Sequence, residues 1–297
     1  MKILITGSGG QLGNELISIL KTGKSEIGEI DKSLLGAEVL AIDVDTLDIT
    51  KQDETVSFIK ENRPDVIINC AAATNVDGCE SNSDLAFKVN AEGVKNLAIG
   101  AKSVGAKLVQ VSTDYVFSGE GDRPYLETDP INPQSVYGRS KAKGEEYATK
   151  ENDKTFIVRT AWLYGYIGKN FVKTVRRVLR EKGGMSVVND QIGNPTNAND
   201  LAHHILKLIP TKEYGIYHCT GEGECSWYDF AAKIAELSGF KGAVKPCTTS
   251  WYNTTYNVPT KRPSYSSLEN AHLKETVGNE MRNWEEAIEE YIKNVKD

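Results

Sequence analysis

A glycine-rich turn close to the N-terminus restricts the folds that this chain can adopt. Gly7, Gly10 and Gly13 are spaced G-x-x-G-x-x-G in the segment GSGGQLG, which follows the apolar run at residues 2–6 and precedes a helix-like pattern. Residues without a Cβ atom let backbone N–H groups approach a pyrophosphate at the N-terminus of the following helix. The position of the motif between a strand and a helix predicts a dinucleotide-binding turn.

Alternating apolar runs and amphipathic stretches continue through the first half of the chain. The apolar runs are rich in Val and Ile and occupy residues 2–6, 39–43, 65–72, 107–112 and 155–162. This alternation is typical of βαβ units, in which helices cover both faces of a parallel sheet. We therefore predict an α/β fold with a Rossmann-like, doubly wound parallel sheet.

The pattern changes after Tyr164, where helix-like segments are separated by loops rich in Gly, Pro, Asn and Thr. We expect residues 1–163 to form the dinucleotide-binding Rossmann domain. Residues 164–297 are expected to form mainly a smaller C-terminal substrate-binding cap, with some segments returning to the sheet.

Charge and composition narrow the classes of partner. The formal net charge of −6 argues against nucleic acid or an anionic membrane surface, since both attract basic proteins. No apolar run reaches the roughly 18 residues of a spanning helix, and MKILITG lacks the features of a signal peptide. The five cysteines include no C-x-x-C, which favours reduced thiols. We predict a cytoplasmic protein with no nucleic-acid and no membrane partner.

A tyrosine and a lysine four residues apart, Tyr137 and Lys141 in YGRSK, are candidate catalytic groups. Residues i and i+4 share one helix face, and a nearby cation lowers the pKa of a phenol from its usual value of about 10. Such a pair suits a reaction in which a carbonyl oxygen takes a proton while hydride arrives at carbon. Thr113 follows the run at 107–112 and can donate a hydrogen bond to the same carbonyl. A solvated helix face and a turn hydroxyl are the alternatives.

Asp43 ends the second apolar run and is placed to accept hydrogen bonds from the ribose of adenosine. This placement favours NAD(H) as the cofactor. An ordinary surface acid is the alternative interpretation, since Asp45 and Asp48 crowd the same segment.

Many ordered motifs resemble one enzyme family over nearly the full length of the chain. They are GSGGQLG, LDIT, AAATNVDGCE, VNAEGVKNLA, STDYVFSG, YGRSKAKGE, RTAWLYG, VVNDQIGNPT and RPSYSSL. With them the chain resembles the dTDP-4-dehydrorhamnose reductases, which belong to the extended short-chain dehydrogenases/reductases. The resemblance implies that NADPH or NADH reduces a dTDP-linked 4-keto-6-deoxy sugar, dTDP-4-dehydro-β-L-rhamnose, to dTDP-L-rhamnose.

The resemblance also implies roles for individual residues. The catalytic residues would be Thr113, Tyr137 and Lys141. The cofactor-binding residues, with the glycines and Asp43 added, would be Gly7, Gly10, Gln11, Leu12, Gly13, Asp43, Asp48, Ile49, Ala72, Ala73, Thr74, Tyr137 and Lys141. The substrate-binding residues would be Thr113, Asp114, Trp162 and Arg262.

Two of the substrate-binding candidates have a structural alternative. Trp162 offers an apolar face that can stack on a sugar or base, but it can equally belong to the core. Arg262 carries a fork of donors that matches phosphate oxygens, which makes it a candidate for the diphosphate. An arginine that anchors a loop is the alternative.

No metal site is predicted. His203 and His204 are adjacent, and no H-x-x-x-H or carboxylate spacing accompanies them. The resemblance implies that some relatives are dimers joined through a glutamate-ligated magnesium ion. Glu15 is present, but Asn199 stands where a second carboxylate is expected. We therefore do not predict this magnesium ion for the present chain. The chain is expected to be a monomer or a homodimer.

Three other functions compete with this interpretation. Nucleotide-sugar 4,6-dehydratases resemble the chain, but they need an Asp–Glu pair after the threonine, and here Asp114 is followed by Tyr115. This difference favours simple carbonyl reduction. Another nucleotide-sugar reductase or epimerase is a second alternative. The third is a non-catalytic NAD(P)-binding regulatory subunit that uses the same fold as a binding module.

Overall fold

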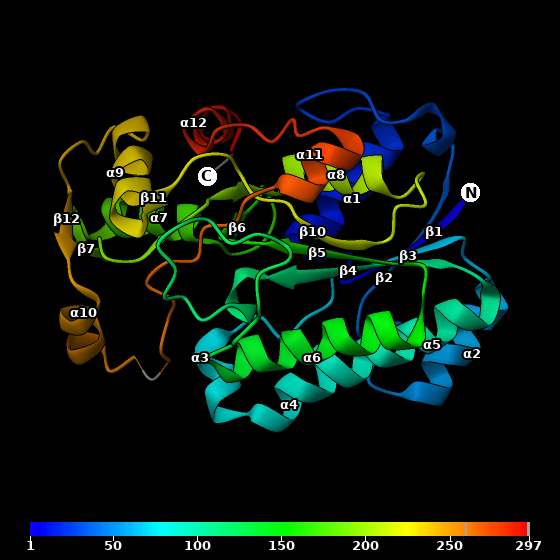
Figure 1. The fold of residues 1–297 in the computed structure, drawn as a ribbon. Helices are drawn as coiled ribbons and strands as arrows, with labels where there is room; N and C mark the ends of the chain where they lie inside the picture. Colours follow the sequence, from blue (N-terminus) through cyan, green and yellow to red (C-terminus); the bar gives the residue numbers. More distant parts are fainter. Residues whose placement is uncertain (259, 296–297) are drawn as a thin grey trace.

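A six-stranded parallel sheet forms the centre of the computed structural model, which describes residues 1–258 and 260–295 (Figure 1). Every neighbouring pair of its strands is parallel. In spatial order the strands are β10 (Gly215–His218), β5 (Thr155–Thr160), β4 (Lys107–Thr113), β3 (Val66–Asn69), β1 (Lys2–Thr6) and β2 (Glu38–Ile42). The predicted Rossmann-like, doubly wound α/β sheet is confirmed.

The strand order reverses direction at β1. β2 lies on one side of β1, whereas β3, β4 and β5 follow on the other side. In open α/β sheets, ligands bind beyond the carboxyl ends of the strands at such a switch point. The topology therefore places a binding site beyond Thr6 and Asn69, the last residues of β1 and β3.

Helices cover both faces of the sheet (Figure 1). On one face lie α2 (Gln52–Asn62), α5 (Val94–Val104) and α6 (Val136–Glu151), and on the other α1 (Gln11–Thr22), α8 (Ala198–Leu208) and α11 (Ala271–Val277). Ile3 and Ile5 of β1 pack into the apolar cluster on one face, and Leu4 packs into the cluster on the other. A strand buried on both faces has apolar residues without alternation, which explains the run ILI.

Short helical segments complete this part of the chain. The 3-10 helix η1 (Lys32–Leu34) precedes β2, and η3 (Asp114–Val116) follows β4. Between β3 and α5 lie α3 (Val76–Ser81), α4 (Ser83–Phe87) and the π-helix η2 (Lys88–Gly93).

Most of the second half of the chain surrounds a third apolar cluster. Helices α7 (Phe171–Lys182), α9 (Trp227–Leu237) and α12 (Trp284–Asn294) contribute side chains to this cluster, whereas α10 (Thr249–Tyr256) has no buried residue. The short strands of this half pair β6 (Leu163–Tyr164) with β9 (Thr196–Asn197), β7 (Met185–Val188) with β12 (Val244–Cys247), and β8 (Ile192–Gly193) with β11 (Cys225–Ser226). From the same half, β10 joins the large sheet, and α8 packs on α1.

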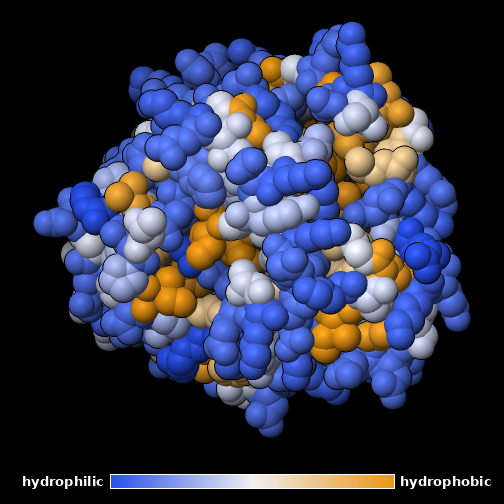
Figure 2. Space-filling model, turned by 45° about the vertical axis from the view of Figure 1, so that its right-hand side comes forward, coloured by the Kyte–Doolittle hydropathy of each residue, from blue (hydrophilic) through white to orange (hydrophobic). Residues whose placement is uncertain are grey.

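The surface carries apolar side chains in separate places. Figure 2 shows one face that is hydrophilic over most of its area, with several distinct apolar patches. Exposed large side chains include Leu35, Val44 and Ile131 in the first half of the chain, and Trp251 and Tyr256, whose rings meet on α10. Scattered apolar residues of this kind are normal for a protein surface. Among the described residues, no helix is long and apolar enough to cross a membrane.

Helix α6 packs so closely against η2 that one of its positions accepts only glycine. A Cβ atom at Gly144 would lie 2.2 Å from the carbonyl oxygen of Asn90. A main-chain oxygen cannot swing away as the end of a long side chain can. The contact between the two segments therefore depends on the missing side chain.

We expect Gly144→Ala to lower the free energy of unfolding by about 1–3 kcal/mol, the usual cost of an overpacked contact. The gain in helix propensity from Gly to Ala, about 1 kcal/mol at most, is smaller. Urea unfolding followed by circular dichroism measures the change. Lys150→Ala on the exposed side of the same helix is the control and should be close to neutral. A Gly144→Ala protein as stable as wild type would contradict the proposed overlap.

Candidate active site

A groove of about 860 Å³ opens at the carboxyl ends of β1, β3 and β4. The structure brings together in it the predicted catalytic and cofactor-binding residues, and also Asp114 and Trp162. Its lining includes Gly7, Gly10, Gln11, Leu12, Gly13, Asp43, Asp48, Ile49, Ala72, Ala73, Thr74, Thr113, Asp114, Tyr137, Lys141 and Trp162. Arg262 is the predicted site residue that does not line it.

The glycine-rich turn forms one wall of the groove. Gly7 has a φ of +64°, and a Cβ atom there would lie 2.6 Å from the backbone nitrogen of Ala71. At Gly13 a Cβ atom would lie 2.5 Å from the carbonyl oxygen of Gly7. These contacts hold the N-terminus of α1, which begins at Gln11, against the end of β1. Free N–H groups and the positive end of the helix dipole meet there, and both favour a phosphate.

Two acids lie on the β2 side of the groove. The carboxylate of Asp43 accepts hydrogen bonds from the N–H groups of Gly9 (3.0 Å) and Val44 (2.9 Å). Asp48 accepts from the hydroxyl of Thr50 (2.7 Å) and from its N–H (3.0 Å), which lowers the pKa of Asp48. Asp43 is thus fixed to the glycine-rich turn itself, at the position expected of an acid that binds an adenosine ribose.

Helix α6 carries the Tyr–Lys pair into the groove. Its N-cap is Ser135, whose hydroxyl accepts a hydrogen bond from the N–H of Gly138. Such caps fix where a helix starts, and this one places Tyr137 in the first turn and Lys141 one turn later. The Lys141 ammonium is buried and donates to the carbonyl of Val111 at 2.6 Å. Burial lowers the pKa of Lys141 to about 8, and the nearby Glu145 opposes this shift.

The environment of Tyr137 differs from the sequence-based expectation. We expected Lys141 to lower the pKa of this phenol, but burial dominates and raises the pKa of Tyr137. A hydrogen bond with the Thr113 side chain acts in the opposite direction. The Tyr137 ring also packs edge-on against Tyr115, at 5.4 Å between centroids. In this structure the phenol is therefore neutral near pH 7 and suited to donating a proton.

Asn90 is a site residue that sequence reasoning missed. It lies buried in η2, and its Oδ1 accepts from the N–H of Ala73 at 2.8 Å. Its Nδ2 donates to the carbonyl of Ala73 (3.1 Å) and to the hydroxyl of Ser140 (3.0 Å). One amide thus fixes the AAAT segment to the helix that carries Tyr137. The signal in the sequence was a polar residue within the apolar helix pattern, and π-helical turns often occur at functional sites.

A buried ion pair lies behind the Tyr–Lys helix. The guanidinium of Arg159 donates to both carboxylate oxygens of Glu145, at 2.9 and 2.7 Å. Ser112 donates to the same carboxylate at 2.5 Å. Glu145 lies one turn after Lys141 on α6, so its charge helps to keep that lysine protonated despite burial. Paired charges of this kind are expensive to break, because either partner alone would remain buried and uncompensated.

Trp162 is held in an unusual conformation at the rim of the groove. Its φ is +47°, which is rare for a bulky residue. The indole stacks on Trp227 at 3.6 Å between ring centroids, with 10° between the planes. Gly193 approaches the ring so closely that a Cβ atom there would lie 2.8 Å from Cε2. One face of the indole is therefore already occupied and cannot stack on a ligand.

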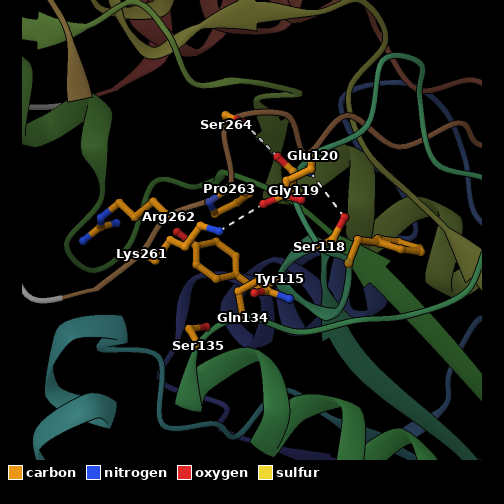
Figure 3. Close-up of a pocket in the computed structure, with 11 residues that line it drawn as sticks. Tyr115, Ser118, Gly119, Glu120, Gln134, Ser135, Lys261, Arg262, Pro263 and Ser264 are labelled. Carbon is orange, nitrogen blue, oxygen red and sulfur yellow. Dashed lines mark hydrogen bonds and ion pairs between the residues drawn. The ribbon is translucent and has the colours of Figure 1, made fainter. Parts of the chain in front are cut away.

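Arg262 lies in a smaller hollow that adjoins the groove (Figure 3). Tyr115 lines both spaces. The guanidinium of Arg262 forms an ion pair with Asp77 of α3, at 3.0 Å, and neighbouring Lys261 pairs with Glu120 at 3.1 Å. Arg262 thus links a C-terminal segment to the first half of the chain. This is the loop-anchoring role that the sequence left as the alternative to diphosphate binding. Its role toward a diphosphate stays a prediction.

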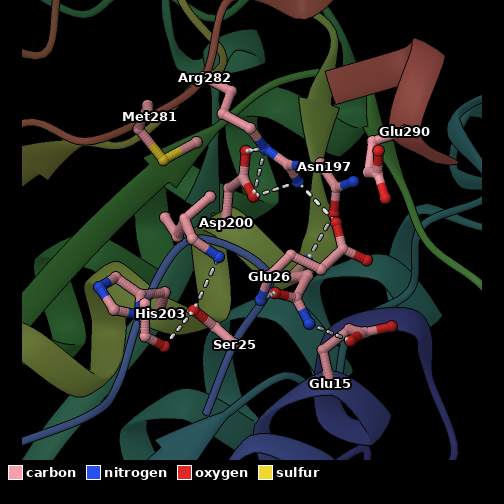
Figure 4. A network of polar contacts seen from close by, with 12 residues as sticks. Glu15, Ser25, Glu26, Asn197, Asp200, His203, Met281, Arg282 and Glu290 are labelled. Atoms are coloured by element: carbon pink, nitrogen blue, oxygen red, sulfur yellow. Dashed lines mark hydrogen bonds and ion pairs between the residues drawn. The ribbon is translucent and has the colours of Figure 1, made fainter. Parts of the chain in front are cut away.

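A polar network at the start of α8 includes Glu15, Glu26 and Asp200 (Figure 4), and the Asn199 side chain bonds to two of its members. Its Nδ2 donates to Glu15 at 2.8 Å, and its Oδ1 accepts from the N–H of Glu26 at 2.8 Å. Arg282 binds both Asp200 and Glu26 through ion pairs. An amide therefore bonds directly to the Glu15 carboxylate. Within residues 1–258 and 260–295, no group of three or more His, Cys, Asp or Glu side chains is placed to hold a metal ion.

The parallel sheet, the glycine-rich turn and the Thr–Tyr–Lys arrangement define a Rossmann-like protein of the extended short-chain dehydrogenase/reductase type. The RmlD substrate binding domain family matches residues 1–297, and the chain belongs to that family.

Similar proteins cover almost the whole chain. It is 40% identical over 291 residues to the spore coat polysaccharide biosynthesis protein SpsK of Bacillus subtilis (strain 168), covering 98% of this chain and 96% of that one. The crystal structure of a dTDP-4-dehydrorhamnose reductase from Clostridium acetobutylicum is 49% identical, with a TM-score of 0.91 and 99% of each chain covered. A dTDP-4-dehydrorhamnose reductase from Bacillus anthracis in complex with NADP is 40% identical, with a TM-score of 0.90 and 99% coverage of both chains.

The burial of Lys141 predicts a cost in stability. We expect Lys141→Met to raise the free energy of unfolding at pH 7 by about 1–3 kcal/mol, since each pKa unit corresponds to about 1.4 kcal/mol. The lysine pKa falls from its ordinary 10.5 to about 8 on folding. The cost is therefore fully present below about pH 8 and disappears as the pH rises from there to about 10.5.

Urea unfolding at pH 7 and near pH 10 measures this difference. The gain from Lys141→Met should shrink at the higher pH. Lys143→Met changes an exposed lysine of the same helix, which pairs with Glu146, and serves as the control without such a pH dependence. A destabilised Lys141→Met protein at pH 7 would show that the ammonium stabilises the fold.

Proposed function

We propose that this chain reduces the 4-keto group of dTDP-4-dehydro-β-L-rhamnose to give dTDP-L-rhamnose, with NADPH or NADH as the reductant. The observation that carries the proposal is that Thr113, Tyr137 and Lys141 line the same groove as the glycine-rich turn. A proton donor therefore lies beside a surface built for a dinucleotide. The two solved reductases described above, similar over almost their whole length, support the choice of a nucleotide-linked sugar ketone.

The residues of the groove fit a nicotinamide dinucleotide. The glycine-rich turn provides a cradle that a Cβ atom at Gly7 or Gly13 would fill with backbone clashes. We assign the pyrophosphate to this turn and to Gln11 and Leu12, and the adenosine ribose to Asp43. Asp48 and Ile49 would lie at the adenine edge, and Ala72, Ala73 and Thr74 would line the remainder. When bound, the cofactor supplies the hydride that reduces C4 of the sugar.

The catalytic side chains then have separate tasks. Tyr137 donates its proton to the ketone oxygen as the hydride adds to carbon. Thr113 hydrogen-bonds the same oxygen and polarises the carbonyl. Lys141 binds the ribose next to the nicotinamide, and its positive charge favours the phenolate that forms when the proton leaves. Because Tyr115 stands where a dehydratase has its second acid, the Asp–Glu pair that eliminates water is incomplete.

We assign cofactor binding to residues 1–163 and sugar-nucleotide binding mainly to residues 164–297. Asp114, Trp162 and Arg262 are the proposed contacts to the sugar nucleotide, with the exposed part of the Trp162 indole available for packing. We further propose that the protein acts in the cytoplasm as a monomer or homodimer. The nucleotide-linked substrate and five unpaired cysteines support that location.

The absorbance of the reduced nicotinamide tests the proposal directly. Purified protein should oxidise NADPH or NADH when dTDP-4-dehydro-β-L-rhamnose is added, and the product should be dTDP-L-rhamnose by mass spectrometry and NMR. Comparing the two cofactors tests whether Asp43 favours NADH, since a carboxylate repels the 2′-phosphate of NADPH. A protein that binds the cofactor but turns over no nucleotide-linked keto sugar would instead fit the non-catalytic regulatory subunit.

Removal of one hydroxyl tests the proton donor. Tyr137→Phe should lower kcat by roughly 10²- to 10⁴-fold, the usual contribution of general acid catalysis, while cofactor affinity changes little. Steady-state kinetics and a fluorescence titration of the cofactor measure the two effects. Tyr147→Phe on the same helix keeps the ring that Lys95 and Lys143 contact and should retain full activity. Turnover near the wild-type rate by folded Tyr137→Phe would exclude Tyr137 as the acid.

A further inference from the structure

The Asp114 carboxyl is an unusual acid in the wall of the groove. It is 2% exposed, and its Oδ1 accepts a hydrogen bond from the Thr113 hydroxyl at 2.8 Å. Its other oxygen, Oδ2, is buried and has no hydrogen-bond partner among the described residues. A buried carboxylate normally has both oxygens satisfied, since an unpaired charged atom is costly. The arrangement is therefore better suited to a carboxyl group that can also be neutral.

The Thr113 hydroxyl has only one proton, and it donates this proton in its hydrogen bond to Asp114. The Thr113 oxygen also accepts the N–H of Tyr115 at 3.2 Å and faces the phenol of Tyr137. An ionised carboxylate can only accept hydrogen bonds, whereas a neutral carboxylic acid can donate one. While Asp114 is ionised, the threonine proton is thus unavailable to a ketone oxygen in the groove.

We propose that the protonation state of Asp114 sets the direction of the Thr113 hydroxyl, and that reduction is fastest when Asp114 is neutral. A neutral Asp114 donates to the Thr113 oxygen and frees the hydroxyl proton for the ketone. Two donors, Thr113 and Tyr137, then meet the oxygen on which negative charge develops. Asp114 itself returns to its starting state, because Tyr137 supplies the proton that the product keeps. Asp114 is thus a positioning residue, and the inference rests on the proposed reductase function.

The surroundings of Asp114 support a titration close to neutral pH. Burial raises the pKa of Asp114 to about 6, and the side chains of Thr113 and Ser266 oppose this shift. From η3 and α6 it faces Tyr115 and Tyr137, whose pKa values burial raises, so both are neutral in this range. Arg262 and Asp77 act on the Tyr115 phenol and form an ion pair with each other.

The Lys141 ammonium of helix α6 interacts with groups other than Asp114. Lys141 donates to the carbonyl of Val111, and Glu145 is the acid that acts on it. Ser266 approaches from the C-terminal part of the chain and is uncharged. Nothing among these described groups holds Asp114 permanently ionised.

The pH dependence of kcat tests the proposal. For the wild type at saturating substrate and cofactor, kcat should fall by roughly 10-fold or more as the pH rises through about 6, because one of two donors is lost. Asp114→Asn should lose this pH step in kcat, and any weakening of the proposed Asp114 contact to the sugar nucleotide should be seen in KM. The amide of Asp114→Asn cannot ionise, and its Nδ2 can donate to the Thr113 oxygen.

A second variant separates this role from substrate binding. Thr113→Val should lower kcat and also remove the step near pH 6, and Asp114→Asn should change little further in that background. A change in KM of Asp114→Asn measures the proposed contact of Asp114 to the sugar nucleotide, whereas loss of the pH step in kcat measures its action through Thr113. Glu120→Gln, at an exposed carboxylate that pairs with Lys261, is the control and should retain the wild-type profile. Carboxyl ¹³C NMR should show that Thr113→Val raises the pKa of Asp114.

The possible outcomes distinguish failure of the positioning role of Asp114 from failure of the proposed reductase function. A wild type that turns over the keto sugar while Asp114→Asn keeps the pH step overturns the positioning role and leaves the proposed function intact. The same holds if folded, cofactor-binding Asp114→Asn loses turnover at every pH, since the carboxylate would then be the working form. A wild type that turns over no keto sugar at any pH overturns the proposed function, and the Asp114 inference with it.

Discussion

The structure depends on a backbone-to-backbone contact at the ends of the first and third strands. Gly7 lies against Ala71 so closely that no side chain fits between them. Gly13 brings α1 down onto the same turn, so the helix N-terminus and the strand ends face one space. The groove lies beyond this contact, at the switch point where β2 and β3 flank β1. Every proposed cofactor contact is arranged around that point.

Burial of polar groups gives the site its chemistry. Asn90 fixes the AAAT segment to the Tyr–Lys helix, and Glu145 with Arg159 forms a buried ion pair behind it. In this low-dielectric setting the pKa of Lys141 falls and that of Tyr137 rises, so both groups move toward their neutral forms. In the proposed reaction, the Tyr137 phenol keeps its proton until a ketone oxygen accepts it. Burying these charged and polar groups lowers the free energy of unfolding, as is common at functional sites.

Much of the fold and the site could be predicted, for identifiable reasons. Strands buried on both faces have continuous apolar runs, so the run ILI and its counterparts indicated the sheet directly. Parallel strands have their carboxyl ends at one edge, where ligands bind, so Thr113 after the run at 107–112 could be expected to lie in the site. The ion pair of Arg262 with Asp77 joins residues 185 positions apart, and no local pattern reports such a contact. Asn90 was missed because a buried amide in a helix looks like any other polar residue.

The sequence by itself determined the parallel sheet, the dinucleotide turn and the pairing of Tyr137 with Lys141, because each depends on local spacing and periodicity. Only the tertiary structure decided the state of those groups. The pKa values of Tyr137 and Asp114 depend on how completely η3, α6 and the C-terminal segment around Ser266 exclude water. The same packing holds the Thr113 hydroxyl in its hydrogen bond to Asp114. Desolvation is a property of the whole packed molecule, and segments distant in sequence create it together.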